Sequence, residues 1–151
     1  MTVKEKELSV SAIREGSVID HIPAGQGMKL LKLLKLTSQR VKMTVGFNLP
    51  SRSMGYKDLI KVEGVEISAE VAGQIAVFAP HATLVLIKDY LVVKKERVTL
   101  PTHITKVIEC TNPSCITNHE PIVTKFSVKR LGKKIGLFCN YCEKGLPYEA
   151  D

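Results

Sequence analysis

The sequence predicts an α+β protein in two parts: an N-terminal sandwich of one antiparallel sheet and two helices, then a small C-terminal antiparallel β domain. Two observations predict this division. Segments with the period of a strand and segments with the period of a helix alternate between residues 8 and 94, whereas all four cysteines of the 151-residue chain follow residue 109. We place the boundary at Leu100-Pro101 and expect domains of residues 1–100 and 101–151.

The first half of the N-terminal pattern contains two extended pieces, a helix and a strand. Residues 8–13 alternate between apolar and polar side chains, and residues 18–22 (VIDHI) form a second extended piece before Pro23. Residues 28–36 (MKLLKLLKL) carry a lysine at every third position, which gives a helix one polar stripe. We expect its apolar surface to pack on the sheet rather than against a membrane or partner. Residues 40–49 have apolar side chains at each odd position, which predicts a strand.

The second half repeats this layout. After a loop at residues 50–56, residues 57–62 predict a strand, and Ser68 is a good N-cap for a helix over residues 69–78 that Pro80 stops. Residues 83–87 and 90–94 then predict a hairpin. Strand, helix and strand thus occur twice, with one extra extended piece. This order is typical of the split βαβ of a ferredoxin-like α/β sandwich, with both helices on one face of the sheet.

The four cysteines predict a zinc site. Cys110 and Cys115 form Cys-x4-Cys, and Cys139 and Cys142 form Cys-x2-Cys after a 23-residue insert, beside expected strands at residues 122–128 and 135–138. Two close pairs can present four thiolates to one Zn2+ per chain, and such a closed cage stabilises the fold rather than catalysing a reaction. Two disulfides are the competing interpretation, but a bond within the Cys139–Cys142 turn is strained. A ligand set that includes His119 is a less favoured alternative.

Composition narrows the class of function. The net charge of +7 and a pI near 9.3 favour anionic partners, which include nucleotides, nucleic acid and acidic protein surfaces. There is no apolar run of membrane-spanning length, and the charged N-terminus does not resemble a signal peptide, so we expect a cytoplasmic protein with no membrane partner. The sequence has no recognisable Ser/His/Asp set, reactive cysteine pair, open metal site or P-loop, so we do not expect an enzyme.

A zinc-ribbon nucleic-acid binder is the second hypothesis, since the chain is basic and carries a four-cysteine cage. That function requires surface aromatic side chains on which bases stack. The metal-binding half contains Phe126, Phe138, Tyr141 and Tyr148. We therefore favour a partner other than nucleic acid.

Seven segments resemble one family with their motifs in register. They are residues 8–13 (LSVSAI), 18–25 (VIDHIPAG), 29–37 (KLLKLLKLT), 46–51 (GFNLPS), 54–63 (MGYKDLIKVE), 110–115 (CTNPSC) and 139–144 (CNYCEK). Together they resemble the regulatory chain of aspartate carbamoyltransferase. The resemblance implies a non-catalytic subunit of pyrimidine biosynthesis, whose N-terminal allosteric domain binds CTP or ATP. It also implies a homodimer joined through the N-terminal sheets, and a zinc domain that docks on the catalytic chain so that regulatory dimers bridge catalytic trimers.

The resemblance also implies roles for individual residues. Lys95 and His21 would face the phosphates, and Asp20 and Lys61 the ribose, with Lys57 as a further cation. The base would lie among Val10, Ala12, Ile13, Val18, Tyr90 and Val92, with backbone groups near Ile13 and Tyr90 reading its edge. Without the resemblance these lysines are ordinary surface charges and these valines ordinary core.

Some positions differ from the family, and others allow two interpretations. Ser11 and Val85 stand where relatives can carry an acidic residue and an amide, so discrimination between CTP and ATP can differ here. The residues around the metal turns would form the docking surface for the catalytic chain or would only shape the turns. They are Asn112, Pro113, Ser114, Asn118, His119, Glu120, Tyr141, Glu143 and Lys144.

Overall fold

The computed structural model describes residues 12–35, 40–132 and 134–146. The N-terminal part contains five strands and two helices, in the order β1 (Gly16–Pro23), α1 (Gly27–Leu33), β2 (Met43–Ser51), β3 (Gly55–Glu63), α2 (Ala69–Phe78), β4 (Thr83–Lys88) and β5 (Leu91–Arg97). The C-terminal part follows with β6 (His103–Thr105), a 3-10 turn η3 (Ile116–Asn118), β7 (Lys125–Leu131), β8 (Lys134–Cys139) and β9 (Gly145–Leu146).

The first sheet has the strand order β2-β3-β1-β4-β5, and its neighbouring strands are antiparallel. Its first four positions, β2-β3-β1-β4, are those of two interleaved split βαβ units, and β5 extends the sheet at one edge. The predicted ferredoxin-like sandwich is therefore confirmed. The second sheet is also antiparallel, with the order β6-β7-β8-β9.

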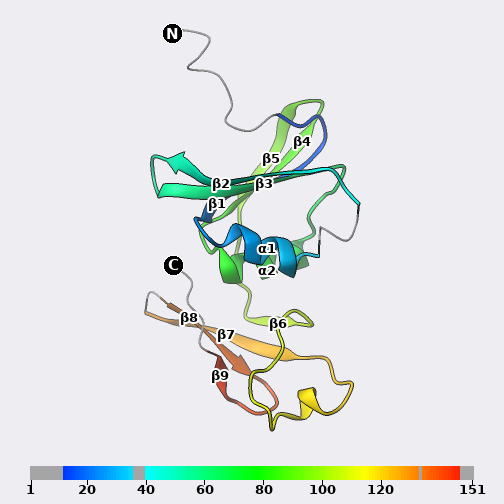
Figure 1. Cartoon of the computed structure of the whole chain (residues 1–151), viewed down its shortest axis with the longest axis vertical. Helices are drawn as coiled ribbons and strands as arrows, with labels where there is room; N and C mark the ends of the chain where they lie inside the picture. The colour runs from blue at the N-terminus through cyan, green and yellow to red at the C-terminus, as the bar shows by residue number, and fades with distance from the viewer. Residues whose placement is uncertain (1–11, 36–39, 133, 147–151) are drawn as a thin grey trace.

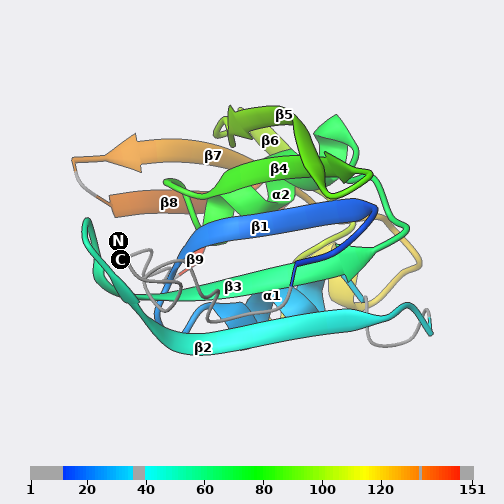
Figure 2. The same ribbon diagram turned by 90° about the horizontal axis from the view of Figure 1, so that it is seen from above.

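Both helices cover the same face of the first sheet. They lie between this sheet and the C-terminal part (Figure 1), and the view from above shows them beneath the strands (Figure 2). The main core lies between sheet and helices, where Ile19, Leu30, Ile60 and Ile75 are fully buried. A smaller cluster of Ile13, Val18 and Leu59 lies apart from this core. We call the face of the sheet opposite the helices the helix-free face.

Several element predictions are confirmed. The helix at residues 69–78 has the expected bounds, and the Ser68 side chain accepts a hydrogen bond from the Val71 N–H at 3.3 Å. The hairpin of residues 83–87 and 90–94 is present as β4 and β5. The expected strands of the C-terminal part are β7 and β8, the first displaced by a few residues. Residues 8–11 of the first predicted strand lie outside the described residues, as does Leu36 at the end of the first predicted helix.

The prediction of a loop over residues 50–56 is wrong at both ends. Pro50 and Ser51 end β2, and Gly55 and Tyr56 begin β3. Proline is tolerated here because β2 is an edge strand, where the missing N–H costs no ladder hydrogen bond. The strict alternation expected for residues 40–49 is also interrupted, because a bulge lies between Gly46 and Leu49. Phe47 is consequently 45% exposed.

Helix α2 contacts the C-terminal part directly. Val77, fully buried at the end of α2, belongs to the apolar cluster that contains Ile104, Phe126 and Leu137 of the second sheet. Phe78 and Leu100 pack against both this cluster and the main core. The two parts therefore share a continuous apolar interior through the end of α2.

Candidate functional site

Two places in the structure gather the side chains that the sequence singled out. The first is a cluster of Cys110, Cys115, Cys139 and Cys142, whose sulfur atoms all lie within 4.8 Å of one another. The Cys110 and Cys142 sulfurs are 3.6 Å apart, and those of Cys115 and Cys139 are 3.7 Å apart. Four sulfurs at about 2.3 Å from a tetrahedral zinc ion lie about 3.8 Å from one another. The cluster therefore fits a zinc ion.

The same distances decide between the alternatives for these cysteines. A disulfide requires sulfurs about 2.05 Å apart, and all four cysteines are free thiols, so the disulfide interpretation is wrong. His119 is not part of the cluster. Its Nε2 lies 2.7 Å from the Pro113 carbonyl oxygen, which it contacts instead of a metal.

Short turns and one strand end hold the cluster. Cys115 precedes the η3 turn, and its N–H donates to the Asn112 carbonyl at 3.0 Å. Cys139 ends β8, and its carbonyl accepts the Glu143 N–H at 2.8 Å in the turn that carries Cys142. Cys110, Cys115 and Cys139 pack with Ile104, Phe126 and Leu137 in the second apolar cluster. The metal site is therefore part of the core of the C-terminal sheet.

The surroundings of the thiols differ. A hydrogen bond from the Thr117 hydroxyl, whose oxygen lies 3.2 Å from the Cys115 sulfur, lowers the pKa of Cys115. Hydrogen bonding from the Asn112 side chain lowers the pKa of Cys142 to about 6. Burial raises the pKa of Cys110 to about 12. Because zinc binds thiolates, metal binding near neutral pH releases the Cys110 proton.

The second place is the helix-free face of the first sheet. Four side chains form a row across it, because Lys61 on β3 pairs with Val18 on β1, Val18 with Val85 on β4, and Val85 with Lys95 on β5. Residues paired across neighbouring strands point to the same face. Two valines therefore lie between two lysines, and three strand spacings separate the lysines by about 14 Å.

A polar cluster lies beside this row. The Lys57 ammonium forms an ion pair with the Asp20 carboxylate at 2.9 Å, and the His21 N–H donates to the same oxygen at 2.6 Å. The His21 Nδ1 lies 3.1 Å from the Thr83 hydroxyl. His21 has a positive φ of 57° and lies within the β1 bulge, so its backbone departs from the extended conformation of the strand. The structure thus brings together Asp20, His21 and Lys57.

At this cluster, burial and the neighbouring charges shift the pKa values of the side chains in opposite directions. Burial raises the pKa of the Asp20 carboxyl, but hydrogen bonds from Lys57 and from the His21 backbone, with the charge of Lys57, bring it below its ordinary value. Burial lowers the pKa of Lys61, and the attraction of Asp20 opposes this only in part. Lys61 is 9% exposed, so a cation is held nearly buried on this face.

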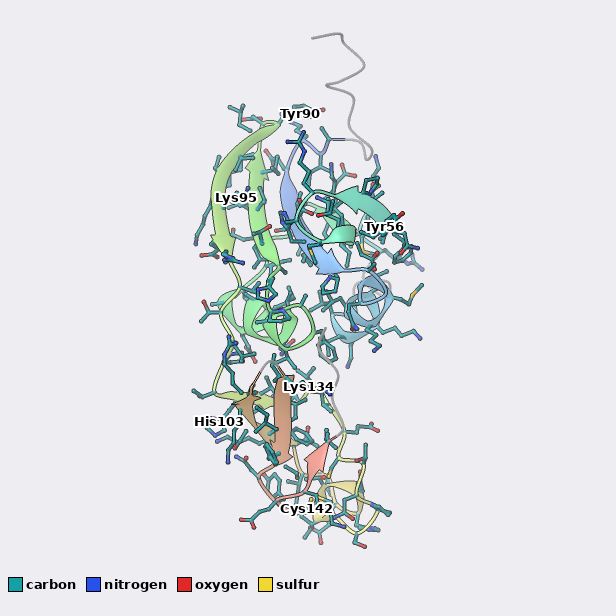
Figure 3. The ribbon with its side chains drawn as sticks, turned by 90° about the vertical axis from the view of Figure 1, so that its left-hand side faces the viewer. Tyr56, Tyr90, Lys95, His103, Lys134 and Cys142 are labelled. Carbon is teal, nitrogen blue, oxygen red and sulfur yellow. The ribbon has the colours of Figure 1, made fainter. Side chains whose placement is uncertain are left out.

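The residues predicted to surround a base are only partly placed. Ile13 and Val18 are buried together, whereas Tyr90 and Val92 are exposed by 65% and 60%. The Tyr90 N–H donates to the Arg14 carbonyl at 3.0 Å, which joins the segment after Ala12 to the β4–β5 turn. Figure 3 shows Tyr90 at the outer end of this hairpin and Lys95 farther along β5. Val10 lies outside the described residues. Contact of any of these side chains with a nucleotide stays a prediction.

Sequence reasoning did not find several residues of this face. Thr83, 9% exposed, contacts His21, and Leu59 packs with Val18. Ile87 lies at the same cluster and pairs with Val92. The alternation of Thr83, Val85 and Ile87 along β4 is the signal that could have found two of them.

The residues expected to ring the metal turns are mostly exposed. They include Ser114, His119, Tyr141 and Lys144, and Ile116 between them is 46% exposed. Cys142 lies at the end of the molecule opposite Tyr90 (Figure 3). A partner held at the metal turns would therefore be remote from the helix-free face.

No helix in the described part of the chain is long and apolar enough to cross a membrane.

Comparison with known proteins finds one family across both parts of the chain. The profile described as "Aspartate carbamoyltransferase regulatory chain, allosteric domain" matches residues 8–99, and that described as "Aspartate carbamoyltransferase regulatory chain, metal binding domain" matches residues 102–150. Curated relatives with the name aspartate carbamoyltransferase regulatory chain include those of Photobacterium profundum, 51% identical over 141 residues, and Aeromonas salmonicida, 49% identical over 141 residues. Each alignment covers 93% of this chain and 92% of the relative. A relative from Tolumonas auensis is 49% identical over 146 residues, which is 97% of this chain and 95% of the relative.

Proposed function

Since the chain belongs to the family of aspartate carbamoyltransferase regulatory chains, we propose that it binds CTP and ATP on the helix-free face and couples this binding to a catalytic chain. Residues 1–100 form the effector domain, and residues 101–151 form the zinc domain that contacts the catalytic chain. The coupling free energy between two such sites is typically about 1 to 3 kcal/mol.

One observation supports the proposed effector site most strongly. It is the row of Lys61, Val18, Val85 and Lys95 across four neighbouring strands. A nucleoside triphosphate needs an apolar floor for its base and cations for its phosphates. The row offers both within about 14 Å. Lys95 and His21 bind the phosphates, and Lys61 with Asp20 binds the ribose.

The base-binding part of the site lies where β1, β4 and the segment before β1 meet. Ile13 and Val18 are packed there, and the exposed Ala12, Tyr90 and Val92 are the further side chains that we expect to contact the base. Val10, which lies outside the described residues, is a proposed base-binding residue from the family resemblance alone. The Tyr90 N–H already donates to Arg14, so its carbonyl is the group left to read the base edge.

We place the contact between two copies of the chain at β2. The first sheet has two edges, and β2 (Met43–Ser51) contains no charged side chain, whereas β5 contains Lys94, Lys95, Glu96 and Arg97. Lysines on an edge strand oppose pairing with another strand. Pairing of two β2 strands about a two-fold axis would continue the sheet without placing like charges opposite one another. We expect Thr44→Lys to shift the dimer towards monomer in sedimentation, and Val93→Lys on β5 to leave it unchanged; the opposite pattern would place the dimer at β5.

The zinc domain docks on the catalytic chain through its metal turns. The four cysteines ligate one structural zinc ion, which supplies folding energy to a segment with a small core of its own. The side chains of Asn112, Tyr141, Glu143 and Lys144 lie on the turns that the metal holds. We also propose a cytoplasmic location, because reduced, metal-bound cysteines are typical of that compartment.

Isothermal titration of the zinc-loaded chain with CTP and with ATP tests the effector site. We expect each nucleotide to bind saturably and to compete with the other, and Lys95→Ala to abolish or strongly weaken binding. Lys129→Ala is the matched control, because it removes one lysine from the C-terminal sheet and leaves the helix-free face intact.

An RNA oligomer in the same titration, at low and high salt, tests the nucleic-acid alternative. Salt-sensitive RNA binding in a chain that ignores CTP and ATP would reject the proposal and favour a zinc-ribbon function.

A further inference from the structure

Asn118 closes the first metal-binding loop from the end of the η3 turn. Its Nδ2 donates to the Cys110 carbonyl at 2.9 Å and to the Asn112 carbonyl at 2.8 Å. An amide nitrogen has two hydrogens, so both of its donors are used. The side chain therefore reaches back eight residues to the first metal ligand.

The turn's own backbone bonds hold a shorter stretch of chain. The Asn118 N–H donates to the Cys115 carbonyl, and the His119 N–H to the Ile116 carbonyl, each at 3.0 Å. These bonds shape residues 115–119 and leave the distance to Cys110 to be set by other contacts. The Asn118 amide supplies such a contact, because it ties the turn to the residue that carries the first thiolate.

The second acceptor of Asn118 connects it to more of the site. The Asn112 carbonyl also receives the Cys115 N–H at 3.0 Å, and the Asn112 Oδ1 accepts the Ser114 N–H at 3.1 Å. The Asn112 side chain in turn lies beside the Cys142 thiol. A hydrogen bond that holds Asn112 in place therefore helps to position Cys142 in the second loop as well as Cys115 in the first.

We propose that Asn118 is a positioning residue of the zinc site, which holds the Cys-x4-Cys loop in its metal-binding shape through two carbonyl hydrogen bonds and so slows release of the metal. It touches no sulfur, and it acts through the backbone of Cys110 and Asn112. Removal of groups that orient metal ligands from the outside typically costs 10- to 100-fold in metal affinity. Because Asn118 is exposed and water can replace part of its bonding, we expect the lower end of that range.

A series of variants separates hydrogen bonding from space filling. Asn118→Ser keeps one donor, Asn118→Ala keeps none, and Asn118→Asp keeps the shape but turns acceptors towards two carbonyl oxygens. Zinc release from the full-length chain is followed with a chromophoric chelator in excess. We expect release to be fastest for Asn118→Asp and about tenfold faster than wild type for Asn118→Ala, and we expect Asn118→Ser, whose shorter side chain does not reach both carbonyls, to release zinc no faster than Asn118→Ala.

Ser114→Ala is the matched control, since Ser114 is exposed in the same loop and contributes its backbone N–H to the Asn112 contact. Its release rate should equal that of wild type. Each chain is also loaded with Co2+, whose d–d absorption reports the geometry of the four thiolates. The bands should change in Asn118→Ala and Asn118→Asp and stay unchanged in Ser114→Ala.

The outcomes separate the two roles of the side chain. Wild-type release from the isosteric Asn118→Asp would show that the side chain only fills space. Wild-type rates and Co2+ spectra throughout the series would also overturn the proposal.

Discussion

The fully buried Asp58 joins three segments of the N-terminal domain, and Asp58→Asn should weaken all three connections. Its Oδ2 accepts the N–H groups of Gly25 and Gly27, and its Oδ1 accepts that of Asn48, each at 3.0 Å. The carboxylate thus holds the start of α1 and the β2 bulge against β3. An asparagine in its place has one acceptor oxygen and turns its NH2 group towards at least one of the three donors.

The expected loss of stability follows from this geometry. If the new amide oxygen faces Gly25 and Gly27, the Asn48 N–H loses its partner, which costs about 2 kcal/mol. The two remaining bonds lose the assistance of the negative charge, which costs about 1 kcal/mol more. The total of about 3 kcal/mol corresponds to a decrease of about 6 to 12 °C in the melting temperature of a chain of this size.

Thermal and urea unfolding of the zinc-loaded chain, followed by circular dichroism, measure this loss. Asp89→Asn is the matched control: the Asp89 side chain is 77% exposed and lies 3.6 Å from Arg14, so its loss should change the free energy of unfolding by less than about 0.5 kcal/mol. A change of less than 1 kcal/mol on Asp58→Asn, or equal changes for both variants, would refute the assignment of Asp58 as the connection between α1, β2 and β3.

Three further predictions concern α2, the metal and Lys61. Gly73→Ala should stabilise the chain by about 0.5 to 1 kcal/mol, because alanine favours the helix and the added Cβ would lie 3.5 Å from Pro101, an ordinary contact; a lower melting temperature would contradict this. Chelation of zinc should unfold the C-terminal domain and release the catalytic chain while nucleotide binding partly survives, and an intact assembly after confirmed zinc loss would disprove it. Because burial lowers the pKa of Lys61 below 10.5, the charged form is lost earlier as pH rises. CTP affinity should therefore decrease as pH rises, and this decrease should begin at a pH lower than 10.5. Lys61→Arg should remove this pH dependence. In the free chain, stability should instead rise with pH between the folded pKa of Lys61 and 10.5, because the unfolded chain binds more protons there.

Elements with local signals were predictable from the sequence. Helix α2 has an N-cap at Ser68, an acidic residue in its first turn at Glu70 and a stop at Pro80, and its bounds match the expectation. The zinc site is equally local, because the spacing of two cysteine pairs and the chemistry of thiolates suffice to indicate the metal.

Features that depend on remote residues were not predictable in the same way. Helix α1 begins at Gly27, where the Asp58 carboxylate accepts the N–H, and it ends at Leu33 although the leucine pattern continues. The β2 bulge places Asn48 at a φ of 56° and exposes Phe47, which an alternating pattern does not reveal.

The candidate effector site depends on strand register more than on any motif. Lys61, Val18 and Lys95 come from three strands, and they share a row only because β1 pairs with both β3 and β4 and β4 pairs with β5. Their residue types alone favour surface or core, so resemblance to a family was needed to select them. Thr83 was missed because its role depends on the orientation of His21, which only the folded strand pair defines.

The most direct test of the account is the steady-state activity of catalytic chains assembled with this zinc-loaded regulatory chain, measured with and without CTP and ATP. We predict that the nucleotides change the aspartate dependence of the assembled enzyme, and that Lys95→Ala abolishes this response while the assembly itself and its activity without nucleotide are retained. An assembled enzyme that responds to neither nucleotide, or one that responds equally with Lys95→Ala, would contradict the proposal that the helix-free face is the regulatory site.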